Sequence, residues 1–327
     1  MIDAFFLNAA IITFSIQFSG FIVAAILQTE IFYDILGGIN FLVLAALAAV
    51  ASGGGGGGAV AGTTPTNNTI FIILFAISRG WLLLFLAWRA HDRKGDSRFD
   101  GVRNVPSRFF IFWMVQGLWV YCISTPLLLV VVVSSNGYST NSTNSSSLWL
   151  NILLLSGMLL SILVEIISDI TKSIWVANGR IGGFCTNGLW YISRHPNYAG
   201  EIFTWIFAAL YSVVFSLQNQ NEFSLSIPSV ILIASISPLF TIHILCNTPA
   251  TGVWNAEGKN LKRYYEDKDK EIGTRYSMYR MSTPPLYPNL IELFIPYKQL
   301  PMSIKRWFYF EWKRYEYNKN DDENKKQ

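Results

Sequence analysis

The sequence predicts an all-α integral membrane protein, a bundle of about seven transmembrane helices within a range of six to eight. Of its 327 residues, 51% are hydrophobic, 15% are aromatic and only 14% are charged, a composition that excludes ordinary soluble and disordered chains. Apolar runs that approach or exceed the roughly 20 residues needed to cross a hydrocarbon core recur along the chain. We predict seven spans: Ala4–Leu27, Ile35–Ser52, Ile70–Trp88, Phe109–Val133, Leu148–Ile167, Ile202–Leu217 and Ile227–Cys246.

The first apolar run has an alternative interpretation as a secretory signal peptide. It begins at Ala4 without a basic segment in front of it, and it shows no small-residue cleavage site before the chain becomes polar. Signal peptides normally carry both features. We therefore expect this run to remain as a membrane span.

Charge in the connections predicts the orientation of the spans. The connection Arg89–Arg108 carries six basic residues, whereas the connections after the second and fourth spans carry no charge. Because cytosolic loops are enriched in lysine and arginine, we expect the first to face the cytosol and the other two the lumen. Counting spans forward then puts Thr171–Gly200 and the chain after Cys246 in the cytosol. Three Asn-x-Ser/Thr sequons agree with the lumenal side: Asn67, Asn141 and Asn144.

Two other features predict no chemistry of their own. The six consecutive glycines Gly53–Gly58 are typical of a flexible linker, because a phosphate-binding loop needs a following lysine and a preceding strand. Cys122, Cys185 and Cys246 are too widely spaced for a disulfide framework or a metal site. The mild net charge of +4 suits a membrane face better than nucleic acid.

The stretch LWYISRHPNYAGEIFTW, residues 189–205, places polar groups between apolar flanks. Pro196 suits the first turn of a helix, because its fixed φ is helical and its missing N–H would have no partner there. The sixth helix should therefore start near His195. Arg194 and His195 then lie beside free backbone N–H groups and the positive end of the helix dipole, which is a site for an anion such as phosphate.

Asn197, Tyr198 and Glu201 share a broad face of the first two turns of this helix. The alternative is that the basic and aromatic residues of the stretch are interfacial anchors. That does not explain Glu201, a carboxylate one turn into an apolar span, where an unpaired charge costs on the order of 2.5–3.5 kcal/mol. We expect one cavity to be lined by this face and by a second polar set at the end of the fifth span: Glu165, Asp169 and Lys172.

The motif GLWYISRHPNYAGE resembles the signature of the steroid 5-alpha-reductase-like membrane proteins. The resemblance is to the branch described only as a conserved domain of unknown function, within a wider group that includes sterol C14 and C7 reductases. Asp96–Val130, the stretch SDITKSIWVANGR and Tyr276–Pro288 are similar to other parts of that domain. The resemblance covers about residues 70–290.

This resemblance implies an NADPH-dependent reductase of a carbon–carbon double bond in a steroid-like, sterol-like or other lipid substrate. It implies a cofactor cavity on the cytosolic side of the helical bundle, in the endoplasmic reticulum membrane. Tyr198 and Glu201 would be the catalytic pair, because either a phenol or a protonated carboxyl could supply the proton that accompanies hydride transfer. The cofactor-proximal positions of the family correspond to Arg194, His195, Asn197, Asp169, Lys172, Tyr276 and Tyr279.

The segment after the last span departs from the family's pattern. It reads CNTPATGVWNAEGKNLKRYYED, so Glu257 and Arg263 correspond only loosely to family positions. No soluble dinucleotide-binding fingerprint is present, because GGGGGG and GRIGGF lack the required spacing, strand and downstream acid.

Two other functions remain open from the sequence. Isoprenylcysteine carboxyl and phospholipid methyltransferases, which use S-adenosylmethionine, share the RHPxYxG core but typically pair it with adjacent glutamates, and here Gly258 follows Glu257. The third possibility is a non-catalytic membrane protein that keeps the fold for lipid binding.

The domain organisation is predicted in three parts. Residues 1–69 form a two-span region with the glycine-rich linker, and residues 70–297 form the reductase-like domain. From Lys298 the chain mixes basic and aromatic residues before a charged end. This composition predicts a segment lying in the membrane interface, followed by disorder.

Overall fold

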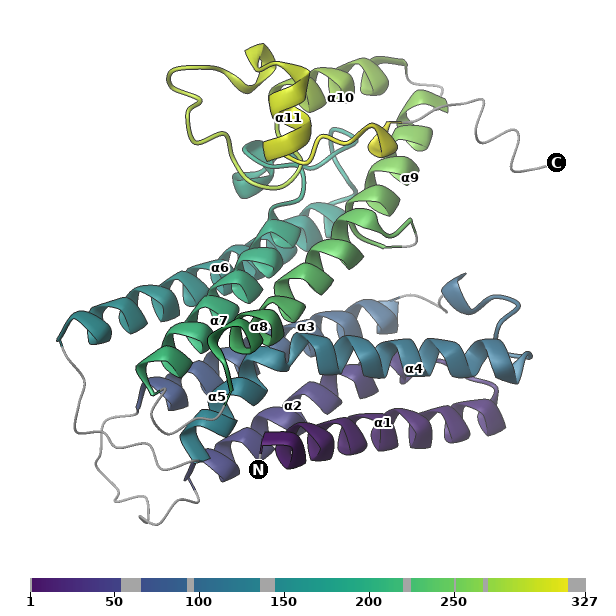
Figure 1. Cartoon of the computed structure of the whole chain (residues 1–327). Helices are drawn as coiled ribbons and strands as arrows, with labels where there is room; N and C mark the ends of the chain where they lie inside the picture. Colours follow the sequence, from purple (N-terminus) through teal and green to yellow (C-terminus); the bar gives the residue numbers. More distant parts are fainter. Residues whose placement is uncertain are drawn as a thin grey trace. The chain divides into compact units, whose positions relative to one another are not determined.

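The computed structural model describes residues 2–53, 66–92, 97–135, 145–219, 225–249, 251–266 and 270–316. These residues form helices and loops without a β-strand (Figure 1), which confirms the predicted all-α class. Six of the described helices are long and apolar enough to cross a membrane, or seven if a bent pair counts as one span. The α-helices are α1 (Ile2–Leu27), α2 (Tyr33–Gly53), α3 (Asn67–Asp92), α4 (Pro106–Ile123), α5 (Thr125–Ser135), α6 (Ser145–Ala177), α7 (Pro196–Gln218), α8 (Ile227–Ile242), α9 (Gly252–Glu266), α10 (Lys270–Ser282) and α11 (Met302–Phe308).

The predicted fourth span, Phe109–Val133, is two helices instead of one. Helix α4 ends at Ile123, and α5 continues from Thr125 at an angle of 48°. Pro126 is the cause, because proline cannot donate the backbone hydrogen bond that would continue α4, whereas it fits the first turn of a new helix. At the break, the hydroxyl of Ser124 donates a hydrogen bond to the carbonyl of Val120 at 2.8 Å, so this carbonyl has a partner.

The helices that position the polar motif are longer than the apolar runs predicted. Helix α6 continues to Ala177, past the predicted end of the fifth span at Ile167. Helix α7 starts at Pro196, six residues before the predicted start of the sixth span at Ile202. The helix start predicted near His195 is confirmed. Polar residues at the ends of both spans are therefore helical, because apolar length alone measures the hydrocarbon crossing and not the helix.

The chain divides into two compact units. Unit 1 comprises Met1–Leu159 and Trp205–Phe240, and unit 2 comprises Leu160–Thr204 and Thr241–Gln327. Helices α6 and α7 therefore contribute residues to both. In unit 1, α1 packs against α4, and α2 packs against α3 (Figure 1).

The interior of unit 1 contains polar side chains at the contacts between its helices. Asn40 of α2 donates to the carbonyl of Thr13 in α1 at 3.1 Å, and Gln116 of α4 donates to the carbonyl of Tyr33 at 2.8 Å. Arg79 of α3 is fully buried, with its guanidinium over the ring of Trp205 at 4.6 Å from the centroid. Interhelical hydrogen bonds and cation–π contacts of this kind hold helices together where water is absent.

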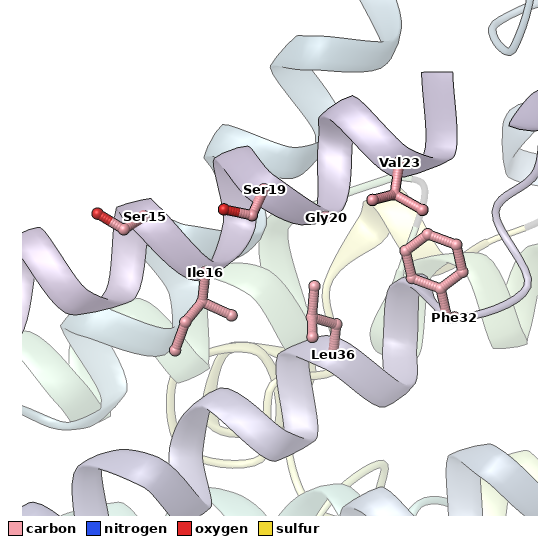
Figure 2. A pocket seen from close by; sticks show the side chains of 7 residues that line it. All are labelled: Ser15, Ile16, Ser19, Gly20, Val23, Phe32 and Leu36. Carbon is pink, nitrogen blue, oxygen red and sulfur yellow. The ribbon is translucent and has the colours of Figure 1, made fainter. Parts of the chain in front are cut away.

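An apolar groove of about 530 Å³ lies between α1 and α2 in unit 1. Figure 2 shows Ile16 and Val23 of α1 on one side and Phe32 and Leu36 on the other. The remaining lining residues are Ser15, Ser19 and Gly20. None of the residues predicted for the functional site lines this groove.

Unit 2 contains chain that the sequence assigned to a separate tail. Tyr297 and Tyr309 are buried in one aromatic cluster with Leu300, and Tyr315 is fully buried, donating to the carbonyl of Cys246 at 2.9 Å. Residues 298–316 therefore pack inside unit 2, and the predicted position of this segment in the membrane interface stays a prediction. The sequence could not predict this packing, because tyrosines that pack inward have the same composition as tyrosines at a membrane interface. Residues 317–327 lie outside the described part of the chain.

Candidate functional site

The polar motif is held in place by backbone contacts in unit 2. The N–H of Arg194 donates to the carbonyl of Pro284 at 3.0 Å, and the hydroxyl of Ser193 donates to the carbonyl of Leu286. The indole N–H of Trp190 donates to the carbonyl of Ser168 in α6 at 3.0 Å. The start of α7 is thus tied both to α6 and to the Thr283–Leu286 stretch that follows α10.

Arg194 and His195 belong to a buried network with two carboxylates. His195 Nε2 lies 2.9 Å from Glu257 Oε1, and Arg194 Nη1 lies 3.3 Å from Glu257 Oε2. A second nitrogen of Arg194 donates to Glu311. Arg194 and His195 are each only 3% exposed, and Glu257 is fully buried. Buried charges are tolerated when they are paired and hydrogen-bonded in this way.

A second arginine closes the network. Arg280 Nε lies 3.4 Å from Glu257, and Arg280 Nη2 donates to Glu311 at 3.0 Å. The hydroxyl of Tyr297 also donates to Glu311, at 3.0 Å. Two guanidinium groups are therefore matched by two carboxylates. A phosphate that bound at Arg194, as the sequence predicts, would have to share that guanidinium with Glu257 and Glu311.

Burial and the carboxylates act in opposite directions on the two residues of the motif. Burial alone would lower the pKa of Arg194, but the charges of Glu257 and Glu311 outweigh it and raise the pKa above its usual value. Burial lowers the pKa of His195, although its hydrogen bond to Glu257 opposes the shift. Arg194 is therefore always charged, while the imidazole is neutral at pH 7.

The next turn of α7 faces α6 across a close contact. A side-chain carbon added at Gly200 would lie 2.7 Å from the backbone nitrogen of Glu165 and 2.8 Å from the carbonyl oxygen of Ser161. The two backbones approach closely because Gly200 has no Cβ. At this contact Asn197 donates to Asp169 at 3.1 Å. Asn197 and Asp169, from the two polar sets that the sequence predicts around one cavity, therefore contact each other directly.

The other predicted residues lie in the same unit at several places. The ring of Tyr198 stacks on His195, with centroids 5.4 Å apart and planes 11° apart. Lys172 places its ammonium 4.1 Å from the centroid of Trp190. Glu165 is buried, whereas Glu201 is half-buried.

The two predicted tyrosines after the last span support the motif from α10. The hydroxyl of Tyr279 donates a hydrogen bond to the carbonyl of Trp190, which belongs to the motif. Tyr276 is buried in an aromatic cluster, 4.5 Å from the ring of Tyr264 and 5.1 Å from the ring of Phe184. Tyr279 therefore lies at the motif's backbone, and Tyr276 in the adjoining core.

Sequence reasoning did not identify Arg280 and Glu311, and it assigned Glu257 only loosely. The signal for Glu257 was available, because α9 is strongly amphipathic and this glutamate lies on its buried face. Glu311 carried no such signal. It lies in a segment whose composition is that of an exposed tail, and only the fold brings it to Arg194.

Fold and site together define a multispanning helical membrane protein with a buried ion network beside the first turn of a span. The family described as "Protein of unknown function (DUF1295)" matches residues 20–280, and the chain belongs to this family. No curated protein and no solved structure matches the chain. The predicted membership in a branch of unknown function is confirmed, and the match begins closer to the N-terminus than predicted. The link to steroid 5-alpha-reductase-like enzymes stays a prediction.

Proposed function

We propose that this protein is a membrane reductase that uses NADPH to reduce a carbon–carbon double bond in a hydrophobic, lipid-like substrate, with its reaction site at the start of α7. The observation that carries the proposal is the stacked pair His195–Tyr198, with His195 bonded to a buried carboxylate. Ionisable groups at the boundary of a membrane span are costly, and they are usually retained for function.

The residues around the pair suit part of the cofactor. The side-chain oxygen of Asn197 is buried and accepts no hydrogen bond within the described residues, so it is available to the carboxamide N–H of a nicotinamide. The guanidinium groups of the network are compensated, so they suit phosphate less well. Arg180 and Arg263 are exposed and lie near Tyr264 in the same unit, and they are the better candidates for the phosphates.

The chain's own part in the reaction would be to supply and hold a proton. The bound cofactor would supply a hydride to one carbon of the double bond. The other carbon of that bond, or a conjugated carbonyl oxygen, would take the proton. Tyr198 is the proposed donor, since its ring is aligned by the stack on His195. His195 and Arg194 are positioning residues, because both are fixed by Glu257. Glu201, one turn further along α7, would orient the donor.

Ligand binding tests the proposal first. NADPH should raise the unfolding temperature of the detergent-purified protein, whereas S-adenosylmethionine should leave it unchanged, because ligands that bind only the folded state stabilise it. Stabilisation by S-adenosylmethionine alone would support a methyltransferase instead. Stabilisation by neither would support a non-catalytic lipid-binding protein.

Substitution of the donor tests the chemistry. In an NADPH oxidation assay across sterols, enones and unsaturated acyl lipids, Tyr198→Phe should lower the rate by about 10²–10⁴-fold with little change in cofactor binding. Glu201→Gln should also lower it while the fold survives. Tyr191→Phe is the matched control, because Tyr191 lies in the same motif with its side chain exposed to solvent. Turnover that survives both test substitutions would exclude these two residues from the reaction.

A further inference from the structure

Several large apolar side chains between residues 290 and 308 of unit 2 are exposed, and they lie outside every described helix that could span a membrane. Leu290, Leu293 and Phe294 are 85%, 98% and 85% exposed, and Trp307 is 84% exposed. Phe308 at the end of α11 is also exposed. We call residues 290–308 the apolar apron. Exposed apolar groups in such density on a folded protein mark an interaction surface.

The apron is held by a hydrogen-bonded frame rather than by its own exposed residues. Asn289 donates to Glu292 at 2.8 Å and to the carbonyl of Ile295 at 2.7 Å, and it accepts from Tyr309 at 2.6 Å. The N–H of Tyr297 also donates to Glu292, at 2.8 Å. The inward side chains are thus fixed, so the fold presents the apolar side chains outward.

The charge around the apron has one predominant sign. Lys298 and Arg306 lie within it and are exposed, and exposed Lys313 follows it. The one acidic residue among residues 290–308 is Glu292, whose carboxylate accepts the internal hydrogen bonds of the frame. The surface therefore combines aromatic and aliphatic groups with cations.

We propose that the apron lies in the headgroup region of the bilayer that the chain spans and binds anionic lipids there. Trp, Phe and Leu side chains insert at the boundary between headgroups and acyl chains, while lysine and arginine pair with lipid phosphates. The compact unit that carries the apron also contains parts of α6 and α7, two helices long and apolar enough to cross the membrane. The inference is independent of the proposed reductase activity, because none of the exposed side chains that would contact lipid belongs to the ion network.

Depth-dependent quenching tests the proposal in the full chain. Leu293→Cys would carry a bimane label in nanodiscs, with Arg275→Cys as the control, because Arg275 is exposed on α10 of the same unit. Wild-type protein labelled in parallel reports the signal of Cys122, Cys185 and Cys246. Lipids brominated near the headgroup should quench the label at residue 293 several-fold more than the label at residue 275. Quenching of both labels by aqueous iodide alone would overturn the proposal.

Charge reversal separates lipid binding from self-association. Lys298→Glu combined with Arg306→Glu should weaken the quenching at residue 293 in nanodiscs that contain phosphatidylserine, and it should have little effect in pure phosphatidylcholine. Equal quenching before and after the reversal in phosphatidylserine would overturn the anionic-lipid part. A disulfide that joins two copies of the Leu293→Cys variant through position 293, with no quenching by brominated lipid, would show that a second chain covers the apron instead.

Discussion

At the scale of single residues, Glu257 connects the parts of the site. Its carboxylate is fully buried and contacts Arg194, His195 and Arg280, which lie before α7 and in α10. Its own helix is α9. One side chain thus links three stretches of unit 2. Removing one partner from such a network leaves the others buried without compensation, which costs more than the ion pairs contribute net.

Glu257→Gln should destabilise the protein strongly, because it leaves two guanidinium groups with one carboxylate between them. We expect a loss of about 3 kcal/mol or more in the free energy of unfolding, measured as a lower unfolding temperature in detergent. Glu316→Gln is the matched control, because Glu316 is exposed in the same unit. Equal unfolding temperatures for the two variants would contradict the buried network.

His195 predicts a dependence of stability on pH. Its pKa is lowered in the folded state by burial, while the unfolded chain keeps the ordinary value of 6.5. The unfolded state therefore binds more protons as the pH falls through 6.5 toward the folded value, so stability is complete above that pH and declines below it.

The unfolding temperature should therefore fall between about pH 7 and pH 5. His195→Gln should reduce this slope, since glutamine does not titrate. A slope in His195→Gln equal to that of the wild type would show that another group is responsible.

At the scale of elements, the contact between α6 and α7 depends on Gly200. Gly200→Ala would place a methyl group within 3 Å of two backbone atoms of α6, which cannot move aside as a flexible side chain can. Overpacking of this kind costs typically about 1–3 kcal/mol. We expect a lower unfolding temperature and weaker ligand binding, because Asn197 and Asp169 lie at the same contact.

Gly258→Ala in α9 is the matched control for this prediction. A side-chain carbon at Gly258 would meet no heavy atom within 4 Å, and helices favour alanine over glycine by up to about 1 kcal/mol. The control should be neutral or stabilising. A similar loss in both variants would mean that glycine flexibility matters rather than the close approach.

Local signals predicted the elements, and distant pairings were beyond them. Pro196 predicted the start of α7, and the apolar runs predicted the spans, because a helix start and a membrane span both depend on residues that are close in sequence. The break between α4 and α5 at Pro126 was not predicted, because Pro126 lies inside a continuous apolar run that is typical of a single span. The meeting of Arg194 with Glu311 depends on the fold of the whole of unit 2, which no local pattern encodes.

At the scale of the whole molecule, the sequence predicts an orientation that the helices alone do not reveal. The basic connection Arg89–Arg108 is expected in the cytosol, and the sequons Asn141 and Asn144 in the lumen. Both sequons lie outside the described residues. Glycosidase treatment should shift the mobility of the protein made in a eukaryotic membrane, and the shift should disappear when all three sequons are removed in the Asn67→Gln, Asn141→Gln, Asn144→Gln triple variant. Protease cleavage at Arg93 from the lumenal side would contradict the orientation.

Unit 2 is assembled from two stretches of chain that the segment Trp205–Phe240 separates. The order of translation therefore matters, since Glu311 follows Arg194 by 117 positions. Until the ribosome reaches residue 311, both arginines of the network share one carboxylate. A premature stop codon between residues 300 and 311 would leave every predicted span encoded while removing this counter-ion. We expect cellular quality control to recognise such a product as unfinished, although it would insert into the membrane as the full chain does.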